Sequence, residues 1–376
     1  MTTEKLTNSP LLLFFILLLL VSCNKEEGCL DPKALNYDPE AEKEDGSCRY
    51  EEGAGTSPST YSFQDADLSP GKVRIQLLDR LVREVKKGAN GSSIALQDLM
   101  DRYRNNGIAG NGVHDLEETL SDQDSLFFKA LLQEIASRSG DPSSLVAGHF
   151  VSPDSIAYRS LIGKGLMGAS FFRYSTDRLL EDLEQYAHAR PEASSPTVRE
   201  SRYDEAFALF GVPRDFNRST SFGTPPEYQQ GAWFWGAACI RTDSALDHLP
   251  AFMDAWIQGR WALTHEKGSE RSDAIQKVER QWERTAGALM IRHAKRCIEA
   301  IDNNQLADRI QHWSELHALH LFLGRNSDGI ISSSQHQTLR NQMGTSPNEC
   351  SVQSMNDLLA TLQNVYGFNN SALQAL

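Results

Sequence analysis

The feature that most constrains the fold is a series of helix-length segments whose apolar residues recur every three or four positions. The series begins near residue 61 and continues almost to the end of the chain. Because an α-helix turns once in about 3.6 residues, this spacing puts the apolar side chains on one face of each helix. Short polar breaks separate the segments, which we place at 71–88, 94–103, 116–135, 152–186, 195–211, 246–263, 272–301, 305–323 and 352–365.

These segments predict an all-α fold, a helical bundle, over residues 61–376, because no convincing series of alternating strands accompanies them. Two helix starts carry local signals. Ser152 precedes Pro153, and Ser195 precedes Pro196. A capping serine followed by proline at the first helical position is typical of a helix N-terminus.

A short apolar run near the N-terminus predicts export from the cytoplasm. Residues 11–21 are all apolar and follow Lys5. A transmembrane helix needs about 20 apolar residues, so this run has the length of a signal-peptide core instead. It ends at Ser22-Cys23, which resembles the site that lipoprotein signal peptidase cleaves. We therefore expect a signal peptide over 1–22 and a mature chain anchored by acyl chains, such as palmitate, on Cys23.

Residues 23–27 contain this anchor and a short charged sequence. After Cys23 come Asn24, Lys25, Glu26 and Glu27. Lysine followed by acidic residues is similar to the export signal that sends some lipoproteins of one Gram-negative phylum to the cell surface. The resemblance implies an outer-membrane lipoprotein exposed on the cell surface. An anchor that faces the periplasm is the alternative.

A cysteine-bracketed segment follows at residues 28–50. Its Gly-Cys, Asn-Tyr and Asp-Gly-Ser-Cys elements resemble a small repeat of surface and secreted proteins in the same phylum. Outside the cytoplasm, Cys29 and Cys48 should form a disulfide, which stabilises so short a loop by roughly 3 kcal/mol. Acidic and amide side chains in the loop leave calcium binding open beside a purely structural spacer. The small and polar residues of 51–60 predict a flexible linker.

The charge balance argues against a nucleic-acid partner. The chain carries 50 acidic and 37 basic side chains, which gives a formal net charge of −13. Nucleic acids and anionic lipid head groups are bound by clustered lysine and arginine, and an acidic surface repels both. We therefore expect the membrane to be bound through lipid alone.

Two parts of the helical region predict either a binding site or a close-packed core. Trp233 and Trp235 follow a long loop at 214–231. Such loops are often functional, so the two indoles form either the wall of a binding cleft or part of the core. The segment 161–172 is apolar nearly all round and contains three glycines. We interpret it as a central buried helix that another helix approaches closely.

Arg260 is unusual for its position on a helix. At about 100° per residue, it falls within an apolar face that includes Trp256 and Trp261. A buried charge requires a partner, because an unpaired one is very costly. A structural ion pair with Glu283 or Glu315 is one interpretation, and an arginine that binds an anion or a substrate is the other.

Two helices also offer side chains that bind metal ions. His293 and Cys297 share one face of their helix, and His312, Glu315 and His320 lie near the apolar edge of the next. His293, His312 and Glu315 are candidate ligands, because zinc and iron sites use these residue types. The Glu-x-x-His and His-Glu-x-x-His patterns of helical metal sites are missing, however. Histidines with hydrogen-bond partners in the core or at its rim are the alternative.

No motif nominates a catalytic residue. The sequence has no Gly-x-Ser-x-Gly elbow, P-loop, dinucleotide-binding glycine motif or Cys-x-x-Cys pair. Without a candidate nucleophile, we expect a binding protein rather than an enzyme, and the sequence specifies no cofactor.

Several segments resemble an uncharacterised family of bacterial helical lipoproteins. They include YRSLIGKGLMGASFF at 158–172, YDEAFALFGVPRDF at 203–216 and FMDAWIQGR at 252–260. The family is similar to the imelysin-like proteins, which implies two packed four-helix bundles, here with halves at 61–190 and 240–376, and a link to iron or haem acquisition. Imelysin was described as a peptidase with a Gly-x-His-x-x-Glu motif. The best counterpart, residues 165–170, lacks both His and Glu.

The sequence therefore predicts a surface-exposed, helical binding lipoprotein that serves nutrient or iron-related capture. Its expected partners are the membrane, through lipid, and a small-molecule or iron-related ligand. The alternative is an imelysin-like envelope metallopeptidase with a non-standard site formed by His293, His312 and Glu315.

Overall fold

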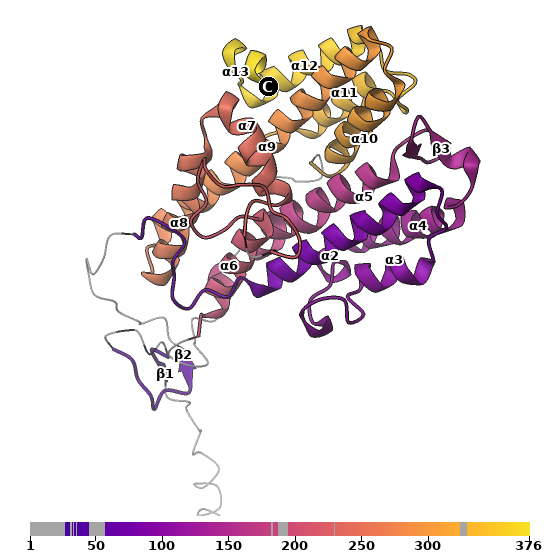
Figure 1. Ribbon diagram of the computed structural model, residues 1–376. Coiled ribbons are helices and arrows are strands. Elements are labelled where there is room, and N and C mark those ends of the chain that lie inside the picture. The colour runs from indigo at the N-terminus through magenta and orange to yellow at the C-terminus, as the bar shows by residue number, and fades with distance from the viewer. Residues whose placement is uncertain are drawn as a thin grey trace, which may run out of the picture.

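The computed structural model of the chain describes residues 27–30, 32, 34, 36–44, 57–181, 183–186, 195–228, 230–323 and 329–376. These residues are predominantly helical, which confirms the predicted all-α fold (Figure 1). The predicted signal peptide, the lipidation site Cys23 and most of the export signal lie outside the described residues. Within the described part of the chain, no helix combines the length and the hydropathy that a membrane span requires.

The N-terminal half of the helical region ends in an unusual helix. Its elements are α2 (Ser69–Lys86), η2 (Lys87–Asn90), α3 (Leu96–Tyr103), η3 (Gly110–Gly112), η4 (Glu117–Thr119), α4 (Asp122–Arg138), η5 (Pro142–Ser144), the hairpin β3 (Leu145–Val146) and β4 (His149–Phe150), and α5 (Tyr158–Leu166). α5 continues into two π-helical segments, η6 (Met167–Arg173) and η7 (Ser175–Leu179), before the short η8 (Leu183–Gln185). Residues 158–172 are mostly buried, as predicted for a central helix.

The remaining helices are longer on average and include a 35-residue helix, α9. They are α6 (Val198–Phe210), α7 (Phe234–Leu246), α8 (Leu249–Thr264), α9 (Gly268–Asp302), α10 (Leu306–Leu323), α11 (Ser333–Met343), α12 (Val352–Tyr366) and α13 (Asn370–Ala375). The periodicity did not indicate α7, α11 or α13. α13 is only six residues long, and α11 buries only two of its residues, Leu339 and Met343.

Both predicted helix starts are wrong by a few residues. Ser152 and Pro153 lie in a turn, because the Ser152 amide donates to the Ile156 carbonyl, and α5 begins only at Tyr158. The second helix, α6, is capped by Thr197. The Thr197 side chain accepts from the Glu200 amide while the Glu200 carboxylate accepts from the Thr197 amide, a reciprocal cap that Ser195 does not offer.

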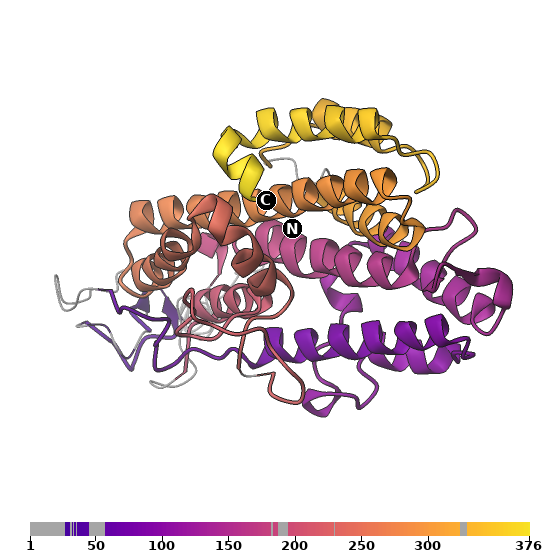
Figure 2. The same cartoon turned by 45° about the horizontal axis from the view of Figure 1, so that its top comes forward.

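The helices stack in tiers that share one core. Figure 2 shows α2 along one side, α5 above it, α9 and α10 next, and α12 with α11 on the opposite side. One continuous cluster of buried apolar residues extends from Tyr61 to Leu376. The division into halves at 61–190 and 240–376 stays a prediction.

Glycine allows a close contact between the central helix and α10. A Cβ atom on Gly168 would lie 2.8 Å from Cβ of Phe322 on α10, and one on Gly165 would lie 3.1 Å from the Phe322 ring. Gly163 faces only a Val82 methyl group at 3.5 Å, which is ordinary contact. The predicted close helix approach therefore takes place at Gly165 and Gly168.

The cysteine-bracketed segment is only partly described. Its residues form a parallel pair of two-residue strands, β1 (Glu27–Gly28) and β2 (Lys43–Glu44). Cys29 is buried and disulfide-bonded. Cys48 lies outside the described residues, so the Cys29–Cys48 pairing stays a prediction. Cys239, Cys297 and Cys350 are free and buried.

Candidate functional site

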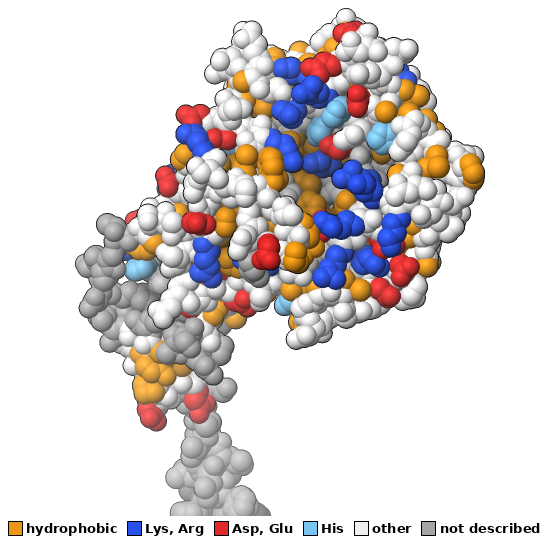
Figure 3. Space-filling view, in the orientation of Figure 1, with side chains coloured by type: hydrophobic (Ala, Val, Ile, Leu, Met, Phe, Trp, Pro, Cys, Tyr) orange, Lys and Arg blue, Asp and Glu red, His pale blue; other side chains and the backbone are white. Residues whose placement is uncertain are grey.

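A cleft of about 280 Å³ opens between α5, α7 and the loop that precedes α7. Figure 3 shows this face of the molecule, on which basic side chains surround a hollow with apolar side chains at its floor. Glu315 of α10 also lines the cleft. The central helix thus forms one wall of the cleft with its residues 159–167, in addition to its role in the core.

Three basic side chains line this cleft without an ion-pair partner. Arg159 and Lys164 come from α5, and Arg241 comes from α7. Among the residues that the structure describes, no carboxylate oxygen lies within 4.0 Å of their nitrogen atoms. Of the described residues that line the cleft, Glu315 is the only acidic one. The cleft is therefore locally cationic in a chain whose net charge is −13.

The surroundings of Lys164, which is half-buried, make its charge costly, whereas Arg159 and Arg241 are exposed. Loss of water around Lys164 lowers its pKa, and the charges of Arg241 and Arg159 lower it further against the opposing effect of Glu315. Partial loss of water also lowers the pKa of Arg241. The charge of Arg292 lowers it further, against the opposing charge of Glu315. A cation that is poorly hydrated and close to like charges gains free energy when an anion binds beside it.

Aromatic side chains form the wall opposite α5. Phe222, Trp233 and Phe234 all line the cleft, and Phe222 is 49% exposed. The guanidinium carbon of Arg241 lies 4.6 Å from the centre of the Phe222 ring, a cation–π contact that leaves the guanidinium edge available for hydrogen bonds. The cleft therefore combines unpaired cations with an apolar, aromatic surface.

Other cavities lack this combination. Two larger ones, of about 500 and 640 Å³, each include a single basic residue in their lining. In another, of about 460 Å³, Arg218 is paired with Asp243 at 2.6 Å and Arg214 donates to backbone carbonyls. A fourth, of about 360 Å³, has a basic lining, but most of its cations are already paired. Arg83 contacts Asp79 at 2.9 Å, and Lys87 and Arg102 contact Glu84 at 2.7 and 2.8 Å.

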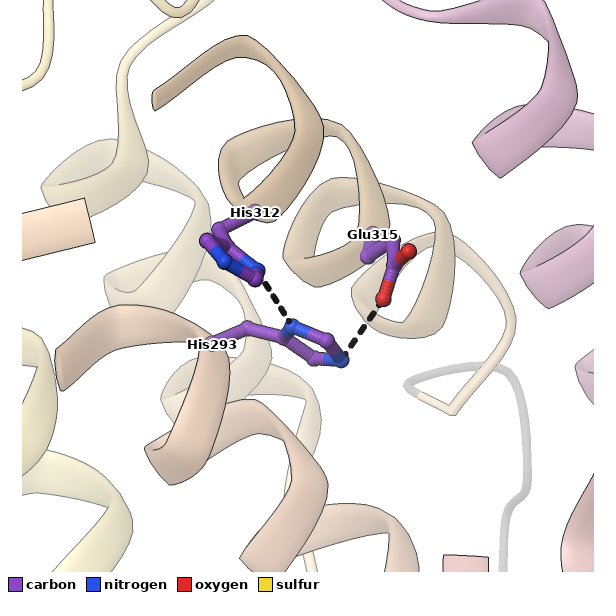
Figure 4. A group of neighbouring side chains, drawn as sticks. All are labelled: His293, His312 and Glu315. Carbon is purple, nitrogen blue, oxygen red and sulfur yellow. Dashed lines mark hydrogen bonds and ion pairs between the residues drawn. The ribbon is translucent and has the colours of Figure 1, made fainter. Parts of the chain in front are cut away.

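The predicted metal ligands lie together beside the cleft. Figure 4 shows His293 of α9 between His312 and Glu315, which are three residues apart on one face of α10. The two Nδ1 atoms of the histidines are 3.3 Å apart, and Nε2 of His293 is 3.0 Å from Oε2 of Glu315. The three residues can each offer one ligand atom so that all three atoms lie within 4.8 Å of one another. Metal binding itself stays a prediction.

Burial controls the charge state of this cluster. It lowers the pKa of His293 to about 3, against the opposing charge of Glu315 and with support from Lys164. Burial also lowers the pKa of His312. For Glu315, burial opposes ionisation, but the positive groups around it, which include Lys164, keep its pKa below the ordinary value. At neutral pH, the cluster thus holds two neutral imidazoles and one carboxylate.

The two candidate tryptophans lie in different places. Trp233 lines the cleft, stacks on Tyr228 at 4.9 Å between ring centres, and donates from Nε1 to the Gln230 carbonyl. Trp235 is completely buried, and its Nε1 donates to the Met167 carbonyl at 2.7 Å. Trp233 can therefore contact a ligand in the cleft, whereas Trp235 supports the helix behind it.

Arg260 is fully buried and paired, as its helical phase predicted, but its predicted partners are wrong. Its guanidinium donates to Asp204 at 2.8 Å, to Glu200 at 2.6 Å and to Asp65 at 3.1 Å. None of the four lines the cleft. Glu283 instead accepts hydrogen bonds from the backbone amides of residues 330 and 331, and Glu315 belongs to the histidine cluster.

Other reactive side chains are enclosed in the core. Cys297 is completely buried. Cys239 lies 3.2 Å from Nε2 of His248, but it is also completely buried, and burial raises the pKa of its thiol. His320 stacks on His336, and the Nε2 atom of each contacts the backbone carbonyl of the other. None of these side chains lines the cleft.

The cations of the cleft carry little signal in the sequence. Lys164 was the detectable one, because it is the single charged residue in the apolar segment 161–172. Arg159 and Arg241 carry no such signal, since an arginine on a polar helix face is ordinary. Comparison with known proteins adds no further guide: no family model, curated protein or solved structure matches this chain. The resemblance to helical lipoproteins and imelysin-like proteins therefore stays a prediction.

Proposed function

We propose that the chain is a cell-envelope binding lipoprotein, exposed on the cell surface, whose cleft binds an anionic small molecule with an apolar or aromatic part. The observation that supports this most is the set of unpaired cations, Arg159, Lys164 and Arg241, in one cleft. An anion would offset the loss of hydration at the half-buried Lys164 and would pair with the exposed Arg159 and Arg241. Phe222 and Trp233 would contact the apolar part of the same molecule.

The remaining charge of the protein favours a small ligand over a polymer. The net charge of −13 repels extended polyanions, so long nucleic acids gain little from three clustered cations. A carboxylate or phosphate that fits within about 280 Å³ senses mainly the local charge. Uptake of a nutrient or of an iron-related compound at the cell surface fits such a ligand and the predicted lipid anchor at Cys23.

The test is to measure binding of benzoate, citrate and inorganic phosphate to the purified mature protein by calorimetry. We expect at least one of these anions to bind, and Lys164→Met or Arg241→Met to weaken that binding about tenfold or more, because a charge-assisted hydrogen bond contributes roughly 1.5–3 kcal/mol. Arg296→Met removes an exposed arginine of α9 outside the cleft and serves as the control. Equal affinity in all three variants would contradict the proposal.

An envelope metallopeptidase is the second candidate, because His293, His312 and Glu315 lie within ligand distance of one another. Two histidines and one glutamate with an open position are the ligand set of several zinc peptidases. In the part of the chain that the structure describes, the cleft lining offers Glu315 but no second carboxylate to act as general base. Cleavage of a peptide mixture by the zinc-loaded protein, lost in Glu315→Gln, would favour this candidate over simple binding.

A further inference from the structure

The histidine–glutamate cluster has the geometry of an incomplete coordination shell. The side chain of His293 is 9% exposed, and its Nε2 atom makes no hydrogen bond although Glu315 Oε2 lies only 3.0 Å away, because the contact lacks hydrogen-bond geometry. A buried ring nitrogen without a hydrogen bond is uncommon and costly. The Nδ1 atoms of His293 and His312 lie 3.3 Å apart and share a hydrogen bond, so His293 would bind a metal through one of its two ring nitrogens while His312 stays close beside it.

The spacing suits a transition-metal ion. Tetrahedral zinc with bonds of about 2.1 Å keeps its ligand atoms about 3.4 Å apart. The three ligand atoms here lie within 4.8 Å of one another, so side-chain rotations that close the widest separation by up to about 1.4 Å would bring all three to bonding distance of one ion. The backbone that carries them is rigid for this purpose, since α9 and α10 pack side by side.

We propose that His293, His312 and Glu315 bind one divalent transition-metal ion, such as zinc or ferrous iron. The bound ion would keep one open coordination position that faces the cleft. Glu315 connects the two features, because it belongs to the cluster and also lines the cleft. An anion in the cleft can therefore reach the metal directly. This part of the inference rests on the proposed anion-binding function.

The basic side chains around the cluster favour binding of the metal ion together with an anionic ligand. Lys164 lies in the cleft beside Glu315, and Arg292 is adjacent to His293 in α9. These charges lower the affinity for a bare divalent cation without abolishing it, and an anionic ligand that joins the metal raises that affinity. Metal and anion should then increase each other's affinity by the same factor, as linkage requires. The ligand class is consequently an anion that coordinates metals.

The first experiment measures metal alone. The full mature protein is freed of metal with a chelator, dialysed against zinc, and analysed for bound zinc, and cobalt(II) is used as a spectroscopic probe of the same site. We expect one equivalent of zinc and a visible cobalt spectrum. Either His312→Gln or Glu315→Gln should weaken zinc binding at least tenfold, and His336→Gln, a histidine on α11 outside the cluster, should leave it unchanged.

The variants are accepted only if their far-ultraviolet circular dichroism matches that of the unaltered protein. Glu315→Gln keeps the shape of the side chain, so it tests the ligand role even if His312→Gln unfolds the helix. Zinc binding that is absent, or that is unchanged in the folded Glu315→Gln variant, would overturn the metal site.

The second experiment measures coupling. Zinc affinity is compared with and without saturating benzoate, a weak chelator that does not compete strongly for zinc. We expect at least a fivefold increase with benzoate, and no increase in Lys164→Met, which keeps all three metal ligands. Equal zinc affinity with and without bound benzoate would overturn the shared site. Benzoate binding to the metal-free protein tests the proposed anion function separately, so a failure of either idea can be recognised.

Discussion

Replacement of Arg260 should destabilise the protein more than any change to a surface charge. Its guanidinium has no exposed area and joins three segments that are far apart in the sequence. Asp204 and Glu200 belong to α6, and Asp65 precedes α2. The guanidinium also lies 5.0 Å above the Phe63 ring. Arg260 thus fixes α8 against both α6 and the N-terminal segment of the helical region.

The magnitude follows from what remains when the arginine is removed. The side chains of Asp65, Glu200 and Asp204 are at most 6% exposed, so water cannot replace the lost partner. Loss of one member of a buried ion pair typically costs about 3–5 kcal/mol, because the other charge is left desolvated. Here three carboxylates lose the same partner. We therefore expect Arg260→Met to cost about 4 kcal/mol or more, and Arg260→Lys to cost less, since it keeps the charge but not the fork of donors.

Urea denaturation, followed by circular dichroism, measures these losses. Arg296→Met is the matched control, because Arg296 is half exposed and its pair with Glu299 is a surface contact worth well under about 1 kcal/mol. The loss for Arg260→Met should also shrink as the pH falls from 7.5 to 5. Unpaired, buried carboxylates have folded pKa values above their unfolded values, so their destabilising effect grows with rising pH.

Two results would refute this reasoning. A change in the free energy of unfolding below about 1 kcal/mol for Arg260→Met would mean that the buried ion pairs contribute no more than a surface pair. A loss that grows as the pH falls would mean that desolvated carboxylates are not its cause. In Asp204, burial already raises the pKa to about 6 despite the charge of Arg260, so its protonation is within reach of the assay.

Three further predictions concern packing, pH and the anchor. Gly168→Ala should lower the free energy of unfolding, measured by urea denaturation, by about 1–3 kcal/mol, because the new Cβ would lie 2.8 Å from Phe322. Gly163→Ala should be neutral or should raise it by up to about 1 kcal/mol, and equal effects of the two substitutions would contradict the packing. Burial lowers the pKa of His317 and His248 to about 4 and of His320 to about 3. As the pH is lowered from about 6.5 to 3, the unfolded chain binds more protons than the folded protein. The free energy of unfolding should therefore fall by up to about 1.4 kcal/mol per pH unit for each of these histidines. A melting temperature that does not change with pH in that range would count against these buried environments. Cys23→Ala should abolish partitioning of the protein into membranes, and retained partitioning would show that residues 11–21 are an uncleaved anchor.

The sequence by itself determined the class of the fold and the side of each long helix that faces the core. Apolar spacing predicted α2, α9, α10 and α12 to within about four residues at each end, and helical phase predicted the burial of Arg260. Both depend on the periodicity of a helix, which is a property of neighbouring residues and needs no knowledge of the fold. The two helix starts predicted from Ser-Pro were wrong, because caps such as Thr197 compete locally with Ser-Pro signals.

Only the tertiary structure decided which side chains meet. Arg260 finds Asp204 at a separation of 56 residues and Asp65 at 195, and neither separation follows from helical periodicity. Arg159 and Lys164 of α5 meet Arg241 of α7 and Glu315 of α10 because these helices pack around one cleft. His293, His312 and Glu315 were recognisable by residue type, but their proximity depends on how α9 and α10 lie against each other. Contacts between distant helices are set by the packing of the whole core, so the sequence pattern alone does not predict which of these side chains share a site.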